Sequence, residues 1–216
     1  MIHNLSSERS IVDHYMEMLR SVDLQNDREQ FRANIKRIGA ILGYEISKEL
    51  EYETKEIKTP MSKMSHPFLS DRVVIITILR AGIPMHEGVL NTFPKAECGF
   101  ISALRKHNES GFHIELEYLA CPDLTGKILI LNDPMLATGQ SFITALDALK
   151  KFGLPKRTIL TAVIASEDGI INLKDRLTHP FDLWVAAIDP ELNKKKYIVP
   201  GLGDAGDLSF GTKLQN

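Results

Sequence analysis

The ten residues at 132–141, with the sequence NDPMLATGQS, combine an acidic side chain with hydroxyls and small residues. They follow the apolar run at 127–131 and precede a segment in which apolar residues recur at helical spacing. At such a strand-to-helix turn, the free N–H groups of the first helical turn and the helix dipole favour an anion. Small residues such as Ala137 and Gly139 let a phosphate group approach the backbone. The stretch therefore predicts a phosphate-binding loop.

The acidic residue of this stretch, Asp133, stands at the carboxyl end of the preceding apolar run, where open α/β sheets bind ligands. A carboxylate would repel the phosphate itself. We therefore expect Asp133 to accept hydrogen bonds from sugar hydroxyls or to help hold a magnesium ion. The alternative is an ordinary turn in which Asp133 is a local cap. A Walker loop is excluded, because the chain contains no G-x-x-x-x-G-K-[ST].

A second glycine-rich stretch, YIVPGLGDAGD at 197–207, could offer backbone N–H and C=O groups to a flat, polar ligand. It contains G-x-G-x-x-G at 201–206, the pattern of a dinucleotide-binding turn. Such a turn needs a following helix, another strand and an acid about 20 residues later, and only residues 207–216 follow. The dinucleotide interpretation is therefore rejected. A ligand-binding loop and a plain surface turn both remain open.

Composition restricts the partners of these stretches. The 216 residues carry a formal net charge of −2, so there is no overall basic excess to hold a nucleic-acid backbone. Cys98 and Cys121 form no C-x-x-C pair, which argues against a disulfide scaffold or a thiolate zinc site and favours a reducing compartment. No signal peptide and no apolar run near the ~20 residues of a membrane span is present. We expect a cytoplasmic protein without nucleic-acid or membrane partners.

The elements that must position the two stretches begin with two helices. The first is predicted to be capped by Ser6 or Ser7 and to run through Leu19. The second is predicted over 27–42 with Gly43 as its stop.

The remaining chain alternates strands and helices. Residues 44–70 are expected to form an irregular β arm, and helices are expected after Gly82 to about Leu90 and over 141–152. Strands are predicted at 72–79, 98–102, 127–131, 157–165 and 182–188. This alternation implies an α/β fold with right-handed crossovers and a mainly parallel sheet covered by helices on both faces.

Three stretches together, ILRAG at 78–82, DPMLATG at 133–139 and YIVPGLGDAGD at 197–207, closely resemble the uracil phosphoribosyltransferase family in order and spacing. The likeness covers nearly the whole chain. It implies a type I phosphoribosyltransferase fold: a mainly parallel twisted sheet flanked by helices, with an N-terminal helical segment and a small β arm or hood. The implied reaction joins uracil to 5-phospho-α-D-ribose 1-diphosphate (PRPP) and gives uridine monophosphate and pyrophosphate. The implied single domain over 1–216 comprises N-terminal helices (1–43), the β arm (44–70), an α/β core (71–190) and a uracil-binding carboxyl-terminal loop (191–216).

The resemblance also implies roles for residues that bind PRPP. Arg80 and Arg105 would hold the pyrophosphate, whose oxygens suit guanidinium forks. The 5′-phosphate and ribose would lie on one continuous loop, with Asp133 on the ribose hydroxyls: Asp133, Pro134, Met135, Leu136, Ala137, Thr138, Gly139, Gln140 and Ser141.

For the nucleobase, the resemblance implies that backbone groups of Ile198, Gly203 and Ala205 read the edge of uracil. Asp204 would also contact uracil and would face the ribosyl donor and any metal. The implied catalytic residues are Arg80, Asp133 and Asp204. Magnesium is implied as the partner of PRPP, with no dedicated metal site in the protein. Activation by GTP, as in some relatives, is left open, and a homodimer or a higher homo-oligomer is expected.

The chain departs from the family pattern at Gln140, where a second glycine is usual. A positive φ at this position would strain glutamine by ~1 kcal/mol or more. If the residue is already helical, glutamine is the better helix former, and its side chain must only point away. We expect the helical alternative. The segment at 106–122 follows the family's charged flexible loop only loosely.

Two other functions on the same fold are considered. A regulatory RNA-binding protein would need a basic face, whereas this chain has a slight acidic excess. A transferase for another base, such as a purine, is disfavoured by the match at 197–207.

Overall fold

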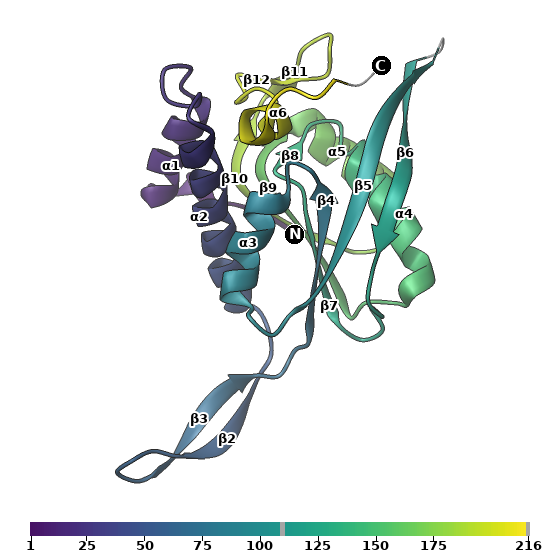
Figure 1. Ribbon diagram of the computed structural model, residues 1–216. Helices are drawn as coiled ribbons and strands as arrows, with labels where there is room; N and C mark the ends of the chain where they lie inside the picture. Colours follow the sequence, from purple (N-terminus) through teal and green to yellow (C-terminus); the bar gives the residue numbers. More distant parts are fainter. Residues whose placement is uncertain (109–110, 215–216) are drawn as a thin grey trace.

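A computed structural model describes the backbone of residues 1–108 and 111–214 and the side chains of 1–102 and 117–214. At its centre is a sheet with the strand order β1-β10-β9-β7-β4-β5-β6, in which β8 also pairs with β9 (Figure 1). All of these pairs are parallel except β5 with β6. The strands are β1 (Ile2–Asn4), β4 (Val73–Leu79), β5 (Glu97–Asn108), β6 (Gly111–Ala120), β7 (Ile128–Asn132), β8 (Met135–Leu136), β9 (Arg157–Ser166) and β10 (Asp182–Asp189). The predicted α/β fold with a mainly parallel sheet is confirmed.

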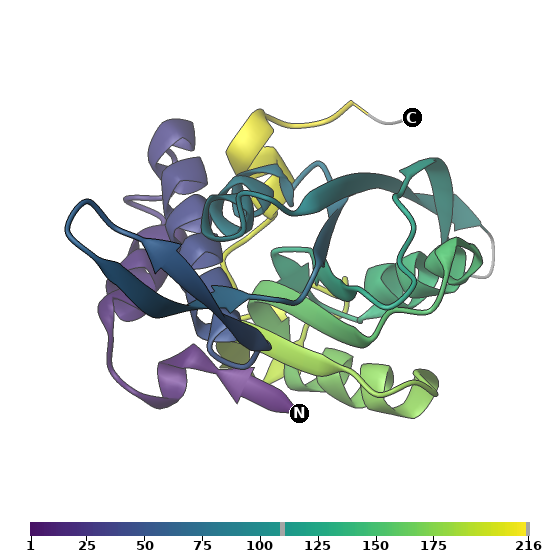
Figure 2. The same ribbon diagram turned by 90° about the horizontal axis from the view of Figure 1, so that it is seen from below.

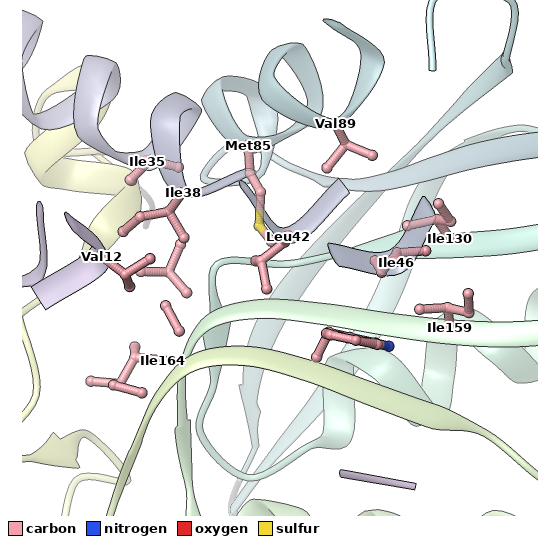
Figure 3. Packing of buried hydrophobic residues seen from close by; sticks show 14 of the residues in the cluster. Val12, Ile35, Ile38, Leu42, Ile46, Met85, Val89, Ile130, Ile159 and Ile164 are labelled. Carbon is pink, nitrogen blue, oxygen red and sulfur yellow. The ribbon is translucent and has the colours of Figure 1, made fainter. Parts of the chain in front are cut away.

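Helices cover both faces of the sheet. Successive side chains of a strand point to opposite faces, and both sets are mainly apolar in β4, so each face must be covered. Val73 and Ile75 of β4 join the hydrophobic core beneath α1 (Ile11–Arg20), α2 (Arg28–Ser47) and α3 (Ile83–Thr92). Figure 3 shows this core, where Met85 of α3 and Leu42 of α2 point toward the strands. Val74 and Ile76 join the second core, beneath α4 (Gln140–Leu149) and α5 (Glu167–Arg176).

The strand order creates a crevice at one place on the sheet. From β4 the chain moves outward to β5 and β6, then returns to place β7 on the other side of β4 and continues to β9 and β10. The connections that leave β4 and β7 therefore diverge to opposite sides. In open α/β sheets, ligands bind at such a switch point, outside the carboxyl ends of the strands. The fold thus favours a site beyond the ends of β4 and β7.

The boundaries of the first two helices differ from the prediction. Ser6 lies in a 3₁₀-helix (Leu5–Ser7), and the cap of α1 is Ser10, which forms a reciprocal capping box with Asp13. The helix α2 continues through Gly43 to Ser47. A Cβ atom on Gly43 would lie 2.9 Å from Oγ1 of Thr92 in α3, so this glycine permits close helix packing and is not a stop.

The arm at 44–70 is regular where it was predicted to be irregular. It consists of β2 (Tyr52–Lys58) and β3 (Lys63–Leu69), an antiparallel hairpin in continuous register from Tyr52↔Leu69 to Lys58↔Lys63. The hairpin projects from the body of the molecule (Figure 1), and in the view from below it lies in front of the amino-terminal helices (Figure 2). Its side chains are nearly all exposed, so it lacks the one-sided burial that makes a strand easy to recognise in a sequence.

The segment at 106–122 also contains strand structure. β5 extends from the predicted end at residue 102 to Asn108 and pairs with β6, which the sequence analysis treated as loop. Apolar and polar residues alternate over 112–118, FHIELEY, and that period-2 pattern identifies the strand.

The helix predicted over 141–152 is confirmed with a modified end. α4 begins at Gln140 and passes at Lys150 into a 3₁₀-helix (Lys150–Phe152), which Gly153 ends with a φ of 104°. Within the described residues, no helix is both long and apolar enough to cross a membrane.

Candidate active site at the carboxyl edge of the sheet

Parts of the three predicted stretches meet beyond the carboxyl ends of β4 and β7. Arg80 directly follows β4 and Asp133 directly follows β7, and the register Thr77↔Asn132 brings these two strand ends side by side. The carboxyl-terminal loop reaches the same place, since a Cβ atom on Gly206 would lie 3.9 Å from Cβ of Ala81. Three stretches far apart in sequence therefore converge at the switch point.

The turn into α4 has the geometry of an anion site. Gly139 is the N-cap of α4, with φ 76° and ψ −7°, a left-handed conformation that suits glycine. Gln140 begins the helix with a negative φ and directs its side chain forward, so that its Nε2 donates to Oγ1 of Thr144 at 3.2 Å. The expectation that Gln140 is helical with its side chain turned away is confirmed. The N–H groups of the first turn of α4 face the turn that precedes them.

Helix α5 and its N-cap hold the same turn through contacts to two loop carbonyls. Ser166, the N-cap of α5, donates from Oγ to the carbonyl of Ala137 at 2.6 Å, and Asn172 Nδ2 donates to the carbonyl of Thr138 at 2.7 Å. A Cβ atom on Gly169 would lie 2.1 Å from the Ala137 carbonyl, so only glycine permits this approach. None of these supports is among the predicted site residues, although Ser166 follows an apolar run and precedes Glu167 and Asp168, as an N-cap commonly does.

Asp133 is buried and forms a local turn. Its Oδ1 accepts a hydrogen bond from the backbone N–H of Met135 at 3.1 Å. The alternative in which Asp133 is a local cap is therefore correct as a description of its backbone contact. This contact also orients the carboxylate at the end of β7, where the predicted ribose would lie.

A buried polar network lies beneath this turn. Oγ1 of Thr77 lies 2.8 Å from Nδ1 of His86, Nδ2 of Asn132 donates to Thr77 Oγ1 at 3.4 Å, and Thr161 Oγ1 donates to Oδ1 of Asn132. Burial lowers the pKa of His86, with Glu87 opposing the shift, so the imidazole is neutral at pH 7. The chain of donors is then consistent if His86 accepts at Nδ1. The network joins β9, β7, β4 and α3 immediately before Asp133.

The carboxyl-terminal loop has little regular structure. It runs through β11 (Glu191–Leu192) and β12 (Ile198–Val199), passes the cis peptide bond before Pro200, and enters α6 (Ala205–Phe210). Asp204 is the N-cap of α6, and its Oδ1 accepts from the N–H groups of Gly206 and Asp207 at 2.9 and 3.0 Å. The carboxylate of Asp204 is thereby fixed at the start of the helix.

Two residues outside the predicted stretches hold this loop. Arg20, at the end of α1, makes a forked contact with the buried carboxylate of Asp189, at the end of β10, with distances of 2.8 and 2.6 Å. Asp189 Oδ2 also accepts from the N–H of Gly201 at 2.7 Å, and Arg20 Nη1 donates to the Gly201 carbonyl at 2.9 Å. Neither residue belongs to a motif, and no local sequence signal identifies them.

Of the two predicted arginines, Arg80 has a described side chain, which contacts the carboxyl-terminal segment. Arg80 is partly exposed, and its Nη2 lies 3.4 Å from Oδ1 of Asp207 and 3.2 Å from the carbonyl of Gly211. The two contacts lie at or beyond the long end of the N–H···O range and the guanidinium is exposed to water, so exchanging these partners for a ligand would cost little. Arg105 falls within β5, but its side chain lies outside the described residues.

Both cysteine thiols favour the protonated form. Cys98 and Cys121 are both free, and burial raises the pKa of both thiols, that of Cys121 to about 11. Across the described part of the chain, no three His, Cys, Asp or Glu side chains cluster in a way that could hold a metal ion.

A cavity of about 700 Å³ lies elsewhere, at the amino-terminal edge of the sheet. Its lining includes Leu129 at the start of β7, Leu149 at the end of α4 and Leu177 after α5. Arg157 also lines this cavity, and its guanidinium is already paired with Asp182 and Glu49. We therefore assign the candidate site to the switch point, where the chemically competent residues converge.

Comparisons with known proteins agree with this assignment. Residues 6–212 match the family model described as uracil phosphoribosyltransferase. A uracil phosphoribosyltransferase of Porphyromonas gingivalis is 44% identical over 215 residues, covering 99% of each chain, and one of Pyrococcus furiosus is 41% identical over 204 residues, covering 93% of this chain and 87% of that one. The solved AQ2163 protein of Aquifex aeolicus has a TM-score of 0.87 at 32% identity over the whole of both chains. A hypoxanthine phosphoribosyltransferase of Staphylococcus aureus (TM-score 0.50, 12% identity, 73% of this chain and 74% of that one) shares the fold alone.

Proposed function

Because the chain belongs to the uracil phosphoribosyltransferase family, we propose that it forms uridine monophosphate and pyrophosphate from uracil and PRPP. The observation that carries the proposal is the meeting of the two glycine-rich loops with the Arg80 turn at the switch point of the sheet.

The 5′-phosphate of PRPP is proposed to bind at the start of α4. The left-handed Gly139 turns the chain so that N–H groups of the following residues face the phosphate, and the helix dipole adds favourable partial charge. The hydroxyls of Thr138 and Ser141 supply further donors. The contacts of Ser166 and Asn172 to the loop carbonyls keep those carbonyls away from the anion.

Bond cleavage at the anomeric carbon builds negative charge on the departing pyrophosphate and positive charge on the ribose. Arg80 and Arg105 are proposed to hold the pyrophosphate, and Arg80 would exchange its long contacts with Asp207 and Gly211 for phosphate oxygens. Asp133 would accept hydrogen bonds from the ribose hydroxyls. These residues would act by positioning the reactants and by balancing charge in the transition state.

Uracil is proposed to lie on the carboxyl-terminal loop, where backbone groups of Ile198, Gly203 and Ala205 would read its edge. Asp204 would face the ribosyl donor from the start of α6, because its contacts to Gly206 and Asp207 fix its carboxylate there. No side chain is assigned as an obligatory general base.

Phosphoribosyltransferases generally use Mg²⁺ together with PRPP, and we propose the same here. The carboxylates nearest the site fit an ion carried by the substrate better than a resident one, since Asp133 and Asp204 both accept backbone N–H groups. The ion would neutralise pyrophosphate charge. Residues of the chain would contribute the arginines and the oriented N–H groups.

An activity screen tests this function. Purified protein should release pyrophosphate from PRPP with uracil and Mg²⁺, and adenine, guanine and hypoxanthine should give far less product. Turnover with a purine alone would favour the alternative base. An absence of turnover together with salt-dependent RNA binding would favour the regulatory alternative.

Three further properties are proposed on family grounds: activation by GTP, a homodimer or higher assembly, and a cytoplasmic location. Adding GTP to the same assay tests the first. Light scattering of the purified protein tests the second, and the exposed apolar side chains Tyr52, Met61 and Phe68 of the projecting arm support it.

A further inference from the structure

The loop around Gly201 depends on two side chains from distant elements. Residues 201–204 have no regular secondary structure, and the preceding strand β12 has only two residues. The contacts of Arg20 and Asp189 reach both polar backbone groups of Gly201, its N–H and its carbonyl. The peptide planes on both sides of this residue are therefore held in one orientation.

The two side chains connect the loop to rigid parts of the fold. Asp189 ends β10, where its backbone pairs with Ser166 of β9, so the strand does not need the carboxylate to stay in the sheet. Arg20 ends α1, whose residues Val12, Met16 and Leu19 are buried in the core. The ion pair thus lies between two fixed elements and directs its remaining hydrogen-bonding groups to the loop.

The hydrogen bond from the N–H of Gly201 to Asp189 also leaves the Ile198 carbonyl out of the turn between Ile198 and Gly201. A Cβ atom on Gly201 would lie 2.2 Å from the carbonyl oxygen of Ile198, so the turn between these residues is tight. In a four-residue turn, the N–H of the last residue often donates to the carbonyl of the first. Here the N–H of Gly201 donates to Asp189 instead. The Ile198 carbonyl, which lies in the proposed uracil loop, does not have to close the turn.

We propose that Arg20 and Asp189 are positioning residues for the nucleobase: by holding both polar backbone groups of Gly201, they orient the backbone at Ile198 and Gly203 for uracil. This inference rests on the proposed function. It adds two residues that touch neither substrate and that control the KM for uracil without controlling the KM for PRPP.

The test compares opposite ends of the same strand. Asp189→Asn removes the charge at the end of β10, and Asp182→Asn removes an equally well-paired charge at its start, where Asp182 contacts Arg157 at 2.6 Å. Initial rates with each substrate varied should give an about tenfold or larger rise in the KM for uracil for Asp189→Asn, with the KM for PRPP within about twofold. Asp182→Asn should leave both KM values within about twofold while lowering the melting temperature.

Two substitutions of Arg20 provide a graded series. Lysine keeps the charge but cannot make the fork to Asp189 and the Gly201 carbonyl together, whereas glutamine loses the charge. The KM for uracil should increase in the order wild type, Arg20→Lys, Arg20→Gln. Since Arg20 is partly exposed, these variants remain informative if Asp189→Asn does not fold.

Amide hydrogen exchange tests directly whether Arg20 and Asp189 hold the proposed uracil loop. In Asp189→Asn and Arg20→Gln, peptides covering 197–207 should exchange faster while peptides covering 133–141 are unchanged. A wild-type protein inactive with uracil would refute the proposed function, and with it the nucleobase role. An active wild type whose Asp189→Asn and Asp182→Asn variants show the same kinetics would refute the positioning role alone, as would an equal rise in both KM values.

Discussion

The loop at 132–141, proposed to bind the phosphate, and the loop at 197–207, proposed to bind uracil, lie at the same edge of the sheet but are held in different ways; they are called the phosphate loop and the uracil loop below. Within the phosphate loop, hydrogen bonds join residues two to four positions apart, as from Met135 to Asp133 and from Gln140 to Thr144. Further side-chain supports come from α5 and its N-cap, where Asn172 and Ser166 lie 34 and 29 positions from the carbonyls that they contact. The carboxyl-terminal segment is held by side chains much farther along the chain: Arg20 contacts Gly201 across 181 positions, and Arg32 contacts the Ser209 carbonyl across 177. The phosphate loop therefore depends on its own residues and on the neighbouring helix α5, while the uracil loop depends on the packing of α1 and α2 from the other end of the chain.

This difference predicts that substitutions separate by substrate. Changes that disturb the phosphate loop should raise the KM for PRPP. Changes in the uracil loop or in its distant partners should raise the KM for uracil. Four changes test that separation.

The largest effect is expected for Gly201→Ala. Alanine would have to adopt a φ of 67° with its Cβ 2.2 Å from the Ile198 carbonyl, so the loop must move. We expect kcat/KM for uracil to fall by about 100-fold or more with a smaller change for PRPP. Gly126→Ala is the matched control, because Gly126 has the same φ of 67° and no atom within 4 Å of its added Cβ. If both variants lose uracil activity equally, backbone strain explains the loss and the close contact does not.

Gly139→Ala is expected to have the next largest effect, on the other substrate. The residue has a φ of 76°, and its Cβ would lie 3.0 Å from the Gly169 carbonyl and 3.1 Å from Leu173, so α5 must shift slightly. The KM for PRPP should rise by about tenfold while the KM for uracil changes little. Steady-state kinetics with each substrate varied measure both values. A larger change for uracil than for PRPP would contradict the separation between the two loops.

His86→Gln tests whether the phosphate loop also depends on the buried polar network beneath it. In this network, His86 contacts Thr77, and Thr77 contacts Asn132, which lies 55 positions farther along the chain. Burial lowers the pKa of His86 in the folded protein below its ordinary value of 6.5. As the pH falls below about 6.5, the unfolded chain therefore binds a proton that the folded protein does not, and wild-type stability decreases until the folded pKa is reached.

Above about pH 6.5, His86 does not make the stability of the wild type depend on pH. The glutamine variant has no such dependence at any pH, because glutamine does not titrate. Urea unfolding at pH 7.5 and 5.5 should show a larger loss of stability for wild type than for His86→Gln. At pH 7.5 the KM for PRPP should change by less than about twofold, because glutamine can also accept from Thr77. A KM increase of about tenfold would show that the phosphate loop depends on its distant network, as the uracil loop depends on Arg20.

The smallest effect is expected for Gln140→Gly. Gln140 is already helical and its side chain contacts Thr144, away from the turn, so removing it should leave the KM for PRPP nearly unchanged. Stability should fall by at most about 1 kcal/mol, because glycine is a poorer helix former. A large improvement in the KM for PRPP would mean that glutamine obstructs the phosphate loop.

The parts of this molecule that could be predicted from sequence are those with local causes. The apolar runs over 72–79 and 127–131 predicted strands buried on both faces, and β4 and β7 are such strands. Gln140 could be placed because helix propensity and the neighbouring glycine both act over a few residues. Ser6, Ser7 and Gly43 misled the prediction because each is a common boundary residue, and only the competing cap at Ser10 and the packing against Thr92 decide the outcome.

The sequence by itself determined the alternation of strands and helices, the family and the two glycine-rich loops, because those features arise from neighbouring residues whose spacing is visible along the chain. Only the tertiary structure decided which residues support the loops. Arg20 and Asp189 lie 169 positions apart, and an ion pair between them requires α1 and β10 to be folded first. A contact of that kind leaves no periodic or local pattern, because its partners are brought together by the packing of other residues.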